Sequence, residues 1–433
     1  MSGSDKAGSG LGEKLGMHTR IANAGRREEW TGPVVNPPIW RASTHLYASE
    51  AERKAATRAD YDGQFFYGRR GAPTQWALAE ALTQIEPGAH GTVLYPSGVA
   101  AITGCMLAVL KPGDHLMVSD NSYDPTRSMA TGLLKRLGVT HSFFDPLDHD
   151  AFARVLDEKG ARAVWFESPG SLTMEVCDIP ALAAIAKGAG AVTMIDNTWA
   201  SALGFAALNH GCDITMQSLS KHVGGHSDLM MGSASAGEKW YRALRRTAQQ
   251  LGQVVSPDDA ALATRGLRTM AMRLERSTHS AARIAAWLAD DPRIVQVMCP
   301  LIPSDPGHAL WRRDFTGGCG LFSFALASDD PSASGAVVDA LDLFGIGYSW
   351  GGFESLALPI YPDEYRAVMA VPGDGRDQTG SGVGPGTGNG AGFDEGAKIA
   401  RGGPRPAIRL SIGLEDPDDL IADLDAALSR WES

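Results

Sequence analysis

Met216-Gln217-Ser218-Leu219-Ser220-Lys221-His222-Val223-Gly224-Gly225-His226-Ser227-Asp228 is the stretch of this chain that says most about its fold. An apolar segment ends here in two serines and a lysine, Ser218, Ser220 and Lys221. Earlier in the chain another apolar segment ends in a carboxylate, within Ile195-Asp196-Asn197-Thr198. Open α/β folds bind their ligands at the carboxyl ends of their strands. We therefore expect Lys221 and Asp196 to belong to one ligand site.

These residue types match the needs of pyridoxal phosphate (PLP). Lys221 offers the amine for a Schiff base, and Asp196 offers a carboxylate for the pyridinium nitrogen. Ser218 and Ser220 offer hydroxyl donors for the phosphate. Each residue alone has an ordinary explanation, because a lysine after a strand is common and Asp196 could cap the following helix. Their combination predicts a PLP-dependent enzyme that acts on amino acids.

Further segments supply groups that the same site would use. In Tyr95-Pro96-Ser97-Gly98-Val99 a strand turns into a helix, so the amides of Gly98 and Val99 are predicted to face a phosphate. Tyr123 could stack on the pyridine ring or be an ordinary core tyrosine. Arg409 lies in an apolar, strand-like run, and its forked guanidinium would bind either a substrate carboxylate or an internal acid.

Composition and charge exclude several classes of protein. The chain has 433 residues, of which 44% are hydrophobic and 21% charged, ordinary values for a globular protein. With 39 Lys and Arg against 50 Asp and Glu, the formal net charge is 39 − 50 = −11, and no basic run is present. Nucleic acid is therefore not expected as a partner. The sequence shows neither an apolar leader nor a long apolar segment, which predicts a cytoplasmic protein without a membrane contact.

The cysteines and histidines predict neither a disulfide framework nor a metal site. The five cysteines are odd in number and widely spaced, so buried free thiols are expected. His222 and His226 have a metal-like spacing, but two glycines lie between them and the glutamate of an HExxH motif is missing.

The pattern along the chain predicts three regions. Residues 1–71 form an N-terminal arm that lacks a helical or strand period from residue 17 onward, and residues 1–16 are expected to be disordered. Residues 72–267 form the PLP-binding domain. Residues 268–433 form a smaller α+β domain, in which a glycine-rich stretch, 373–403, is expected to be a mobile insertion.

Short apolar strands that alternate with helices predict a mostly parallel sheet covered on both faces. The expected strands of the large domain are 92–95, 115–119, 163–166, 191–195, 214–217 and 229–233. A helix is predicted over 75–85, with an apolar face and a stop at Pro87-Gly88. The C-terminal domain should contain a strand over 320–326 and a final helix with Asp416 as N-cap and Pro417 at its first position.

In their order along the chain, these residues resemble the Cys/Met-metabolism family of fold-type I PLP enzymes, whose α/β fold is that of the aspartate aminotransferases. The resemblance runs from about Thr19 to Leu428, and within the family it is strongest to the bacterial cystathionine β-lyases. The strings that carry it are Tyr67-Gly68-Arg69-Arg70-Gly71, Glu167-Ser168-Pro169-Gly170-Ser171-Leu172-Thr173-Met174-Glu175-Val176, Met194-Ile195-Asp196-Asn197-Thr198-Trp199-Ala200, Thr264-Arg265-Gly266-Leu267-Arg268-Thr269, Tyr348-Ser349-Trp350-Gly351-Gly352 and Ile412-Gly413-Leu414-Glu415-Asp416.

The resemblance implies a role for each matching residue. Lys221 would carry PLP, with Asp196 on the pyridinium nitrogen and Tyr123 on the ring. Tyr67 and Arg69 would reach the phosphate of a neighbouring subunit, and Tyr67 would join Lys221 and Tyr123 in catalysis. The phosphate would also be bound by Gly98, Val99, Ser218 and Ser220, and the substrate carboxylate by Arg409, Ser349 and Trp350. A homotetramer built of catalytic dimers is expected.

The activity that the resemblance implies is β-elimination on L-cystathionine or a related cysteine thioether, giving a thiol, pyruvate and ammonia. Three features depart from the family pattern: His222 after the lysine, Ser220 in place of threonine, and the insertion at 373–403. A γ-acting relative, either a cystathionine γ-synthase or a methionine γ-lyase, is the main alternative. A PLP-binding regulatory protein without turnover is a remote one.

Overall fold

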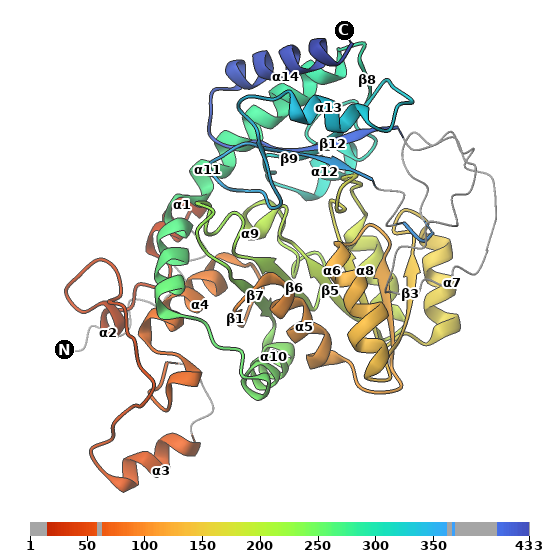
Figure 1. Ribbon diagram of the computed structural model, residues 1–433. Helices are drawn as coiled ribbons and strands as arrows, with labels where there is room; N and C mark the ends of the chain where they lie inside the picture. Colours follow the sequence, from red (N-terminus) through yellow and green to blue (C-terminus); the bar gives the residue numbers. More distant parts are fainter. Residues whose placement is uncertain (1–14, 59–62, 362–365, 369–404, 433) are drawn as a thin grey trace. The chain divides into compact units, whose positions relative to one another are not determined.

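The computed structural model describes residues 15–58, 63–361, 366–368 and 405–432. The chain divides into two compact units, each with strands covered by helices (Figure 1). Unit 1 contains Met1–Val109 and Ala200–Met272, and unit 2 contains Leu110–Trp199 and Arg273–Ser433. The glycine-rich insertion predicted at 373–403 lies outside the described residues, as do residues 1–14 of the terminus that was expected to be disordered.

Unit 1 has three strands in the order β1-β7-β6, and β7 runs antiparallel to both of its neighbours. Helices α4, α5 and α10 pack on these strands. The elements of this unit are α1 (Met17–Asn23), α2 (Glu28–Thr31), α3 (Glu50–Arg58), η3 (Gly68–Arg70), α4 (Pro73–Ile85), β1 (Gly91–Tyr95), α5 (Gly98–Val109), α9 (Ser201–Gly204), β6 (Ile214–Ser218), β7 (Gly232–Ala236) and α10 (Glu238–Leu251).

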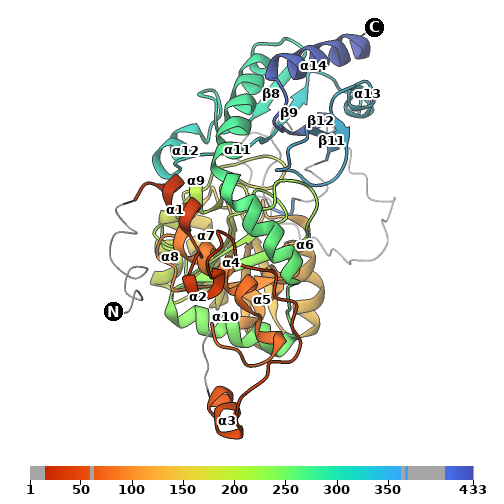
Figure 2. The ribbon, with the colours of Figure 1, turned by 90° about the vertical axis from the view of Figure 1, so that its left-hand side faces the viewer.

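Contrary to prediction, the N-terminal arm contains regular structure. Helix α1 packs on α4, and its Ile21 is only 1% exposed. The carbonyls of Ile21 and Ala24 accept hydrogen bonds from the guanidinium of Arg268. This short helix is thus stabilised by a distant residue, which explains why its own periodicity does not show it. Helix α3 projects from the rest of unit 1 at the end of an extended segment (Figures 1 and 2).

Unit 2 contains four parallel strands in the order β5-β4-β2-β3. Helices α7 and α8 pack beside β3 and β5. The elements of this part are β2 (His115–Ser119), α6 (Asp124–Met129), η4 (Ala130–Leu134), β3 (Thr140–Phe144), α7 (His149–Lys159), β4 (Ala163–Glu167), α8 (Ile179–Gly188) and β5 (Val192–Asp196). Strand β4 is buried from Ala163 to Phe166, as expected for a parallel strand covered on both faces.

Unit 2 also contains a five-stranded sheet in the order β10-β11-β12-β9-β8. All its pairs are antiparallel except β10 with β11. Helix α13 packs on α14 and β11. The elements are β8 (Ile294–Met298), α12 (His308–Asp314), β9 (Leu321–Leu326), α13 (Ala333–Asp339), β10 (Gly345–Ile346), β11 (Leu356–Ile360), β12 (Ala407–Ser411) and α14 (Pro417–Glu432).

Most of the predicted elements are confirmed, with small shifts at their ends. The predicted helix over 75–85 is α4, and the final helix begins at Pro417 with Asp416 as its cap, whose Oδ1 accepts from Asp418 N at 3.1 Å. The strand expected over 229–233 begins only at Gly232, and β3 was not predicted. All five cysteines are free and buried, as expected.

One long helix, α11 (Pro257–Ala289), contains the predicted domain boundary between residues 267 and 268. The division into a PLP-binding domain and a C-terminal domain at that point stays a prediction. Within the described residues, no helix is both long and apolar enough to span a membrane.

A buried acid in unit 1 makes the stability of the fold depend on pH. Glu86 follows α4 and is 2% exposed. Its Oε2 accepts from Gln217 Nε2 at 3.5 Å, and its Oε1 has no hydrogen-bond partner among the residues that the structure describes. Burial raises the pKa of Glu86 to about 8.

The folded protein therefore keeps a proton on Glu86 that the unfolded chain releases in the ordinary carboxyl range. Stability falls as pH rises from that range to about 8, by at most about 1.4 kcal/mol per pH unit. We expect Glu86→Gln to become progressively more stable than the wild type as pH rises, measured by urea unfolding of the apoprotein. The exposed variant Glu50→Gln is the control. A constant difference between Glu86→Gln and the wild type would contradict the assignment.

Candidate active site

The predicted site residues form two groups, one in each unit. Lys221, Ser218, Ser220, Gly98, Val99, Tyr67 and Arg69 belong to unit 1, and Asp196, Tyr123, Arg409, Ser349 and Trp350 belong to unit 2.

Lys221 lies in a turn that directly follows β6. Its backbone N–H donates to Ser218 O at 3.2 Å, and its carbonyl accepts from Gly225 N at 2.8 Å. Leu219 is fully buried and Val223 is 2% exposed, so apolar side chains on both sides fix the turn in the interior of unit 1. The lysine itself is only half-buried. The turn thus holds the backbone of Lys221 firmly.

The start of α5 lies against Ser218. A Cβ built on Gly98 would come 2.9 Å from Ser218 Oγ, closer than side-chain carbons normally approach. Glycine therefore allows the start of the helix to come this close to the end of β6. Helix α5 is 12 residues long, and its N-terminal end offers the amides of Gly98 and Val99 to an anion.

Ser220 has a different immediate role from Ser218. Its Oγ accepts from Met231 N at 2.9 Å and donates to Met231 O at 3.2 Å. The hydroxyl thereby ties the lysine turn to the residue before β7. Its predicted contact with a phosphate stays a prediction and would require the hydroxyl proton to turn away from Met231 O.

Tyr67 and Arg69 lie in the arm of unit 1. Tyr67 is 45% exposed, and Arg69 Nη1 donates to Gln249 O at 2.9 Å. Between them, Gly68 packs so closely that a Cβ would lie 2.3 Å from Ala42 O. The predicted reach of both residues into a neighbouring subunit stays a prediction.

Asp196 is the last residue of β5 and is 8% exposed. Its Oδ1 accepts hydrogen bonds from both the backbone N–H and the hydroxyl of Thr198. Two donors on one oxygen stabilise the ionised form of a carboxylate. The carboxylate of Asp196 is therefore suited to bind a cationic group.

Tyr123 is at the N-terminal end of α6, with its side chain 44% exposed. Burial of part of the ring raises the pKa of its hydroxyl, and the negative charges of Asp196 and Glu167 raise it further, while Arg409 opposes them. The charges of Asp196 and Arg409 thus both act on Tyr123 within unit 2.

Arg409 is the middle residue of β12, and its Nη2 donates to Ser349 O at 3.2 Å. Burial lowers the pKa of its guanidinium, an effect that Tyr123 and Tyr348 partly offset. The internal salt bridge considered as an alternative is not found: no carboxylate among the described residues pairs with Arg409. Trp350 follows Ser349 and is half-buried. The arginine is therefore available to a carboxylate from outside the chain.

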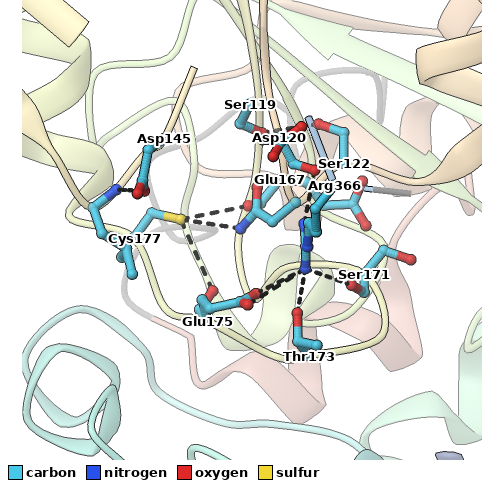
Figure 3. Close-up of polar contacts among 12 residues, drawn as sticks. Ser119, Asp120, Ser122, Asp145, Glu167, Ser171, Thr173, Glu175, Cys177 and Arg366 are labelled. Atoms are coloured by element: carbon cyan, nitrogen blue, oxygen red, sulfur yellow. Dashed lines mark hydrogen bonds and ion pairs between the residues drawn. The ribbon is translucent and has the colours of Figure 1, made fainter. Parts of the chain in front are cut away.

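The sequence prediction missed a second group of polar residues in unit 2, which Figure 3 shows. Glu167 ends β4 and accepts from Tyr123 N at 2.7 Å. Asp120 follows β2 and binds Arg127 Nη1 at 2.6 Å, and its carbonyl accepts from Arg366 Nη1 at 2.7 Å. An acid directly after an apolar strand is the signal that identified Asp196, and it could have identified Glu167 and Asp120 too.

The chain is similar to known proteins over almost its whole length. A family model described as Cys/Met metabolism PLP-dependent enzyme matches residues 18–380. Cystathionine beta-lyase MetC of Escherichia coli (strain K12) is 40% identical over 417 residues, which are 96% of this chain and 98% of that protein. The cystathionine beta-lyase of Salmonella typhimurium (strain LT2) is 39% identical over 417 residues, with the same coverage of 96% and 98%.

Solved structures agree with the expected fold. Cystathionine gamma synthase from Xanthomonas oryzae pv. oryzae, in complex with aminoacrylate and cysteine, has a TM-score of 0.82 and 31% identity to this chain, covering 96% of it and 99% of the matched structure. This match shows the fold-type I α/β class. Within unit 1 the close approach of Gly98 to Ser218 suits a phosphate, and within unit 2 the acid Asp196 suits a protonated ring nitrogen, as PLP would require. The chain belongs to the Cys/Met metabolism family of PLP-dependent enzymes.

Proposed function

We propose that this protein is a PLP-dependent carbon–sulfur lyase that converts L-cystathionine to homocysteine, pyruvate and ammonia, with activity on other cysteine S-conjugates. The observation that carries the proposal is the identity of 40% to a cystathionine beta-lyase across 96% of the chain.

The residues of unit 2 support binding of an amino-acid substrate. Arg409 has no acidic partner among the described residues, and its charge acts on Tyr123. A half-buried guanidinium without an acidic partner favours an anionic ligand. The substrate α-carboxylate is the anion that every amino-acid substrate supplies. Ser349, whose carbonyl accepts from Arg409 at 3.2 Å, would hold the guanidinium in place.

Each residue then has a chemical task. When bound, PLP supplies a conjugated ring that accepts the electron pair left at the substrate Cα. Lys221 would hold PLP and, once released, would remove the Cα proton of the substrate. Asp196 would favour the protonated form of the pyridine nitrogen, and Tyr123 would pack against the ring. The thiolate leaves from Cβ, and water completes the conversion to pyruvate and ammonia.

The oligomer and the cellular location belong to the same proposal. Tyr67 and Arg69 lie in an arm with exposed apolar side chains, among them Val35 at 63% and Leu46 at 91%. Exposure on this scale favours a surface that a second copy covers. We infer a homotetramer of catalytic dimers, in which these two residues reach the phosphate of the neighbouring subunit. The site is proposed to act in the cytoplasm.

The product distinguishes this proposal from a γ-acting enzyme such as the related γ-synthase. γ-Elimination needs a second proton removal, at Cβ, whereas β-elimination needs only Cα deprotonation and an aligned Cβ–S bond. We expect Trp350 beside the carboxylate site to restrict the reorganisation that the longer route requires. Purified protein given L-cystathionine should release pyruvate with little 2-oxobutyrate, as identified by chromatography, and Lys221→Ala should release neither. Predominant 2-oxobutyrate would refute the β-lyase assignment and leave the PLP site intact.

Substitution of Arg409 tests the carboxylate site separately. Arg409→Met removes a charge-assisted contact to substrate, so kcat/KM should fall by roughly 100-fold or more while PLP content stays normal. Arg409→Lys keeps the charge without the planar fork, so its kcat/KM should lie between those of Arg409→Met and the wild type. The exposed variant Arg242→Met, which removes only a surface ion pair with Glu238, is the control. A kcat/KM for Arg409→Met close to that of the control would exclude Arg409 from substrate binding.

A further inference from the structure

Glu167 is an acid that the predicted site does not include. It ends β4, and the parallel pairing places it opposite Asp196 on β5. Its Oε2 accepts from the backbone N–H of Tyr123 at 2.7 Å. One side chain thus lies beside the proposed partner of the pyridine nitrogen and holds the main chain of the proposed stacking residue.

The charged groups around Glu167 leave its carboxyl without an ion pair. The cation that acts on it is Arg366, whose guanidinium donates to Asp120 O, Thr173 Oγ1 and Glu175 (Figure 3). The guanidinium of Arg366 forms its ion pair with Glu175, at 3.3 Å, and not with Glu167. In the part of the chain that the structure describes, no Arg, Lys or His forms a salt bridge with Glu167.

The remaining neighbours favour a neutral group. Asp196 is an acid whose Oδ1 accepts two hydrogen bonds from Thr198. The thiol of Cys177 donates to Glu167 O at 3.7 Å and is itself uncharged, because burial raises its pKa to about 12. Burial, followed by the charge of Asp196, raises the pKa of Glu167 well above its usual range. Two adjacent carboxyl groups that cannot both ionise share one proton.

We propose that Glu167 is a positioning residue of the PLP site, which in its neutral form accepts the Tyr123 N–H and leaves Asp196 as the acid that faces the pyridine nitrogen. Glu167 would act through these two residues, by holding the main chain of Tyr123 in place and by limiting the negative charge beside Asp196. The inference rests on the proposed PLP site. It does not depend on which thioether is the substrate.

Three variants separate the effect of the Glu167 proton, the effect of its hydrogen-bond acceptor and a general effect on folding. Glu167→Gln keeps a carbonyl acceptor for Tyr123 and mimics the neutral acid. Glu167→Leu keeps similar bulk and leaves the Tyr123 N–H unpaired. Glu86→Gln, which removes the buried acid of unit 1, is the matched control.

The first readout is the affinity of the apoprotein for PLP, measured by equilibrium dialysis. Glu167→Gln and Glu86→Gln should bind within about 3-fold of the wild type, whereas Glu167→Leu should bind about 10-fold or more weakly, since the main chain of Tyr123 loses its acceptor and is no longer held in place. Equally weak binding by Glu167→Gln and Glu167→Leu would show that the charge is needed and would overturn the proposal. Wild-type affinity in a folded Glu167→Leu variant would overturn it as well.

The second readout, the urea midpoint of the apoprotein against pH, decides the question even where Glu167→Leu fails to fold. The folded wild type holds a proton on Glu167 that the unfolded chain releases, so rising pH favours unfolding of the wild type but not of Glu167→Gln. The midpoint of the variant should therefore rise relative to the wild type as pH increases above the ordinary carboxyl range. A variant that is instead less stable by a constant amount would mean that Glu167 is ionised. Because neither readout uses turnover, normal results together with absent pyruvate would refute the proposed function alone.

Discussion

The proposed active site depends on one electrostatic constraint, a carboxylate held at the end of a buried strand. Asp196 ends β5, is 8% exposed and is bonded by Thr198. Such a carboxylate is costly to bury unless a cation compensates it. In the proposed site a protonated pyridine nitrogen would supply that cation, and the electron-accepting power of PLP depends on the same proton. The identity of the residue at this strand end therefore decides which chemistry the fold can perform.

The neighbouring strands show how this constraint extends through unit 2. β2, β4 and β5 are all followed by polar side chains, and their carboxyl ends share one edge because the strands are parallel. Glu167 connects Asp196 to Tyr123, while Arg366 is occupied by Glu175 and the carbonyl of Asp120. Asp120, Glu175 and Arg366 at this edge thus compensate one another. Arg409, on β12 of the other sheet, pairs with no carboxylate among the described residues, consistent with a ligand that brings its own carboxylate.

Much of the fold could be predicted because its strands are short and apolar and its helices carry clear stops. The strands that flank Lys221 and Asp196 follow from these patterns. Strand β3 was missed because it is mostly half-exposed and has a mixed composition, and α1 because its stability comes from Arg268 rather than from its own sequence. The role of Glu167 depends on partners far away in the chain. It could not be predicted because the register between strands is not contained in the periodicity of a single strand.

The most direct test of the account is the position of the covalent PLP linkage. Reduction of the purified yellow protein with borohydride, followed by peptide mapping, should recover the cofactor on Lys221. That lysine lies in a fixed turn after β6, whose last residue, Ser218, lies against the start of α5. Recovery of the reduced adduct on any other lysine would contradict the account, because the phosphate site and the acid would then serve a different amine.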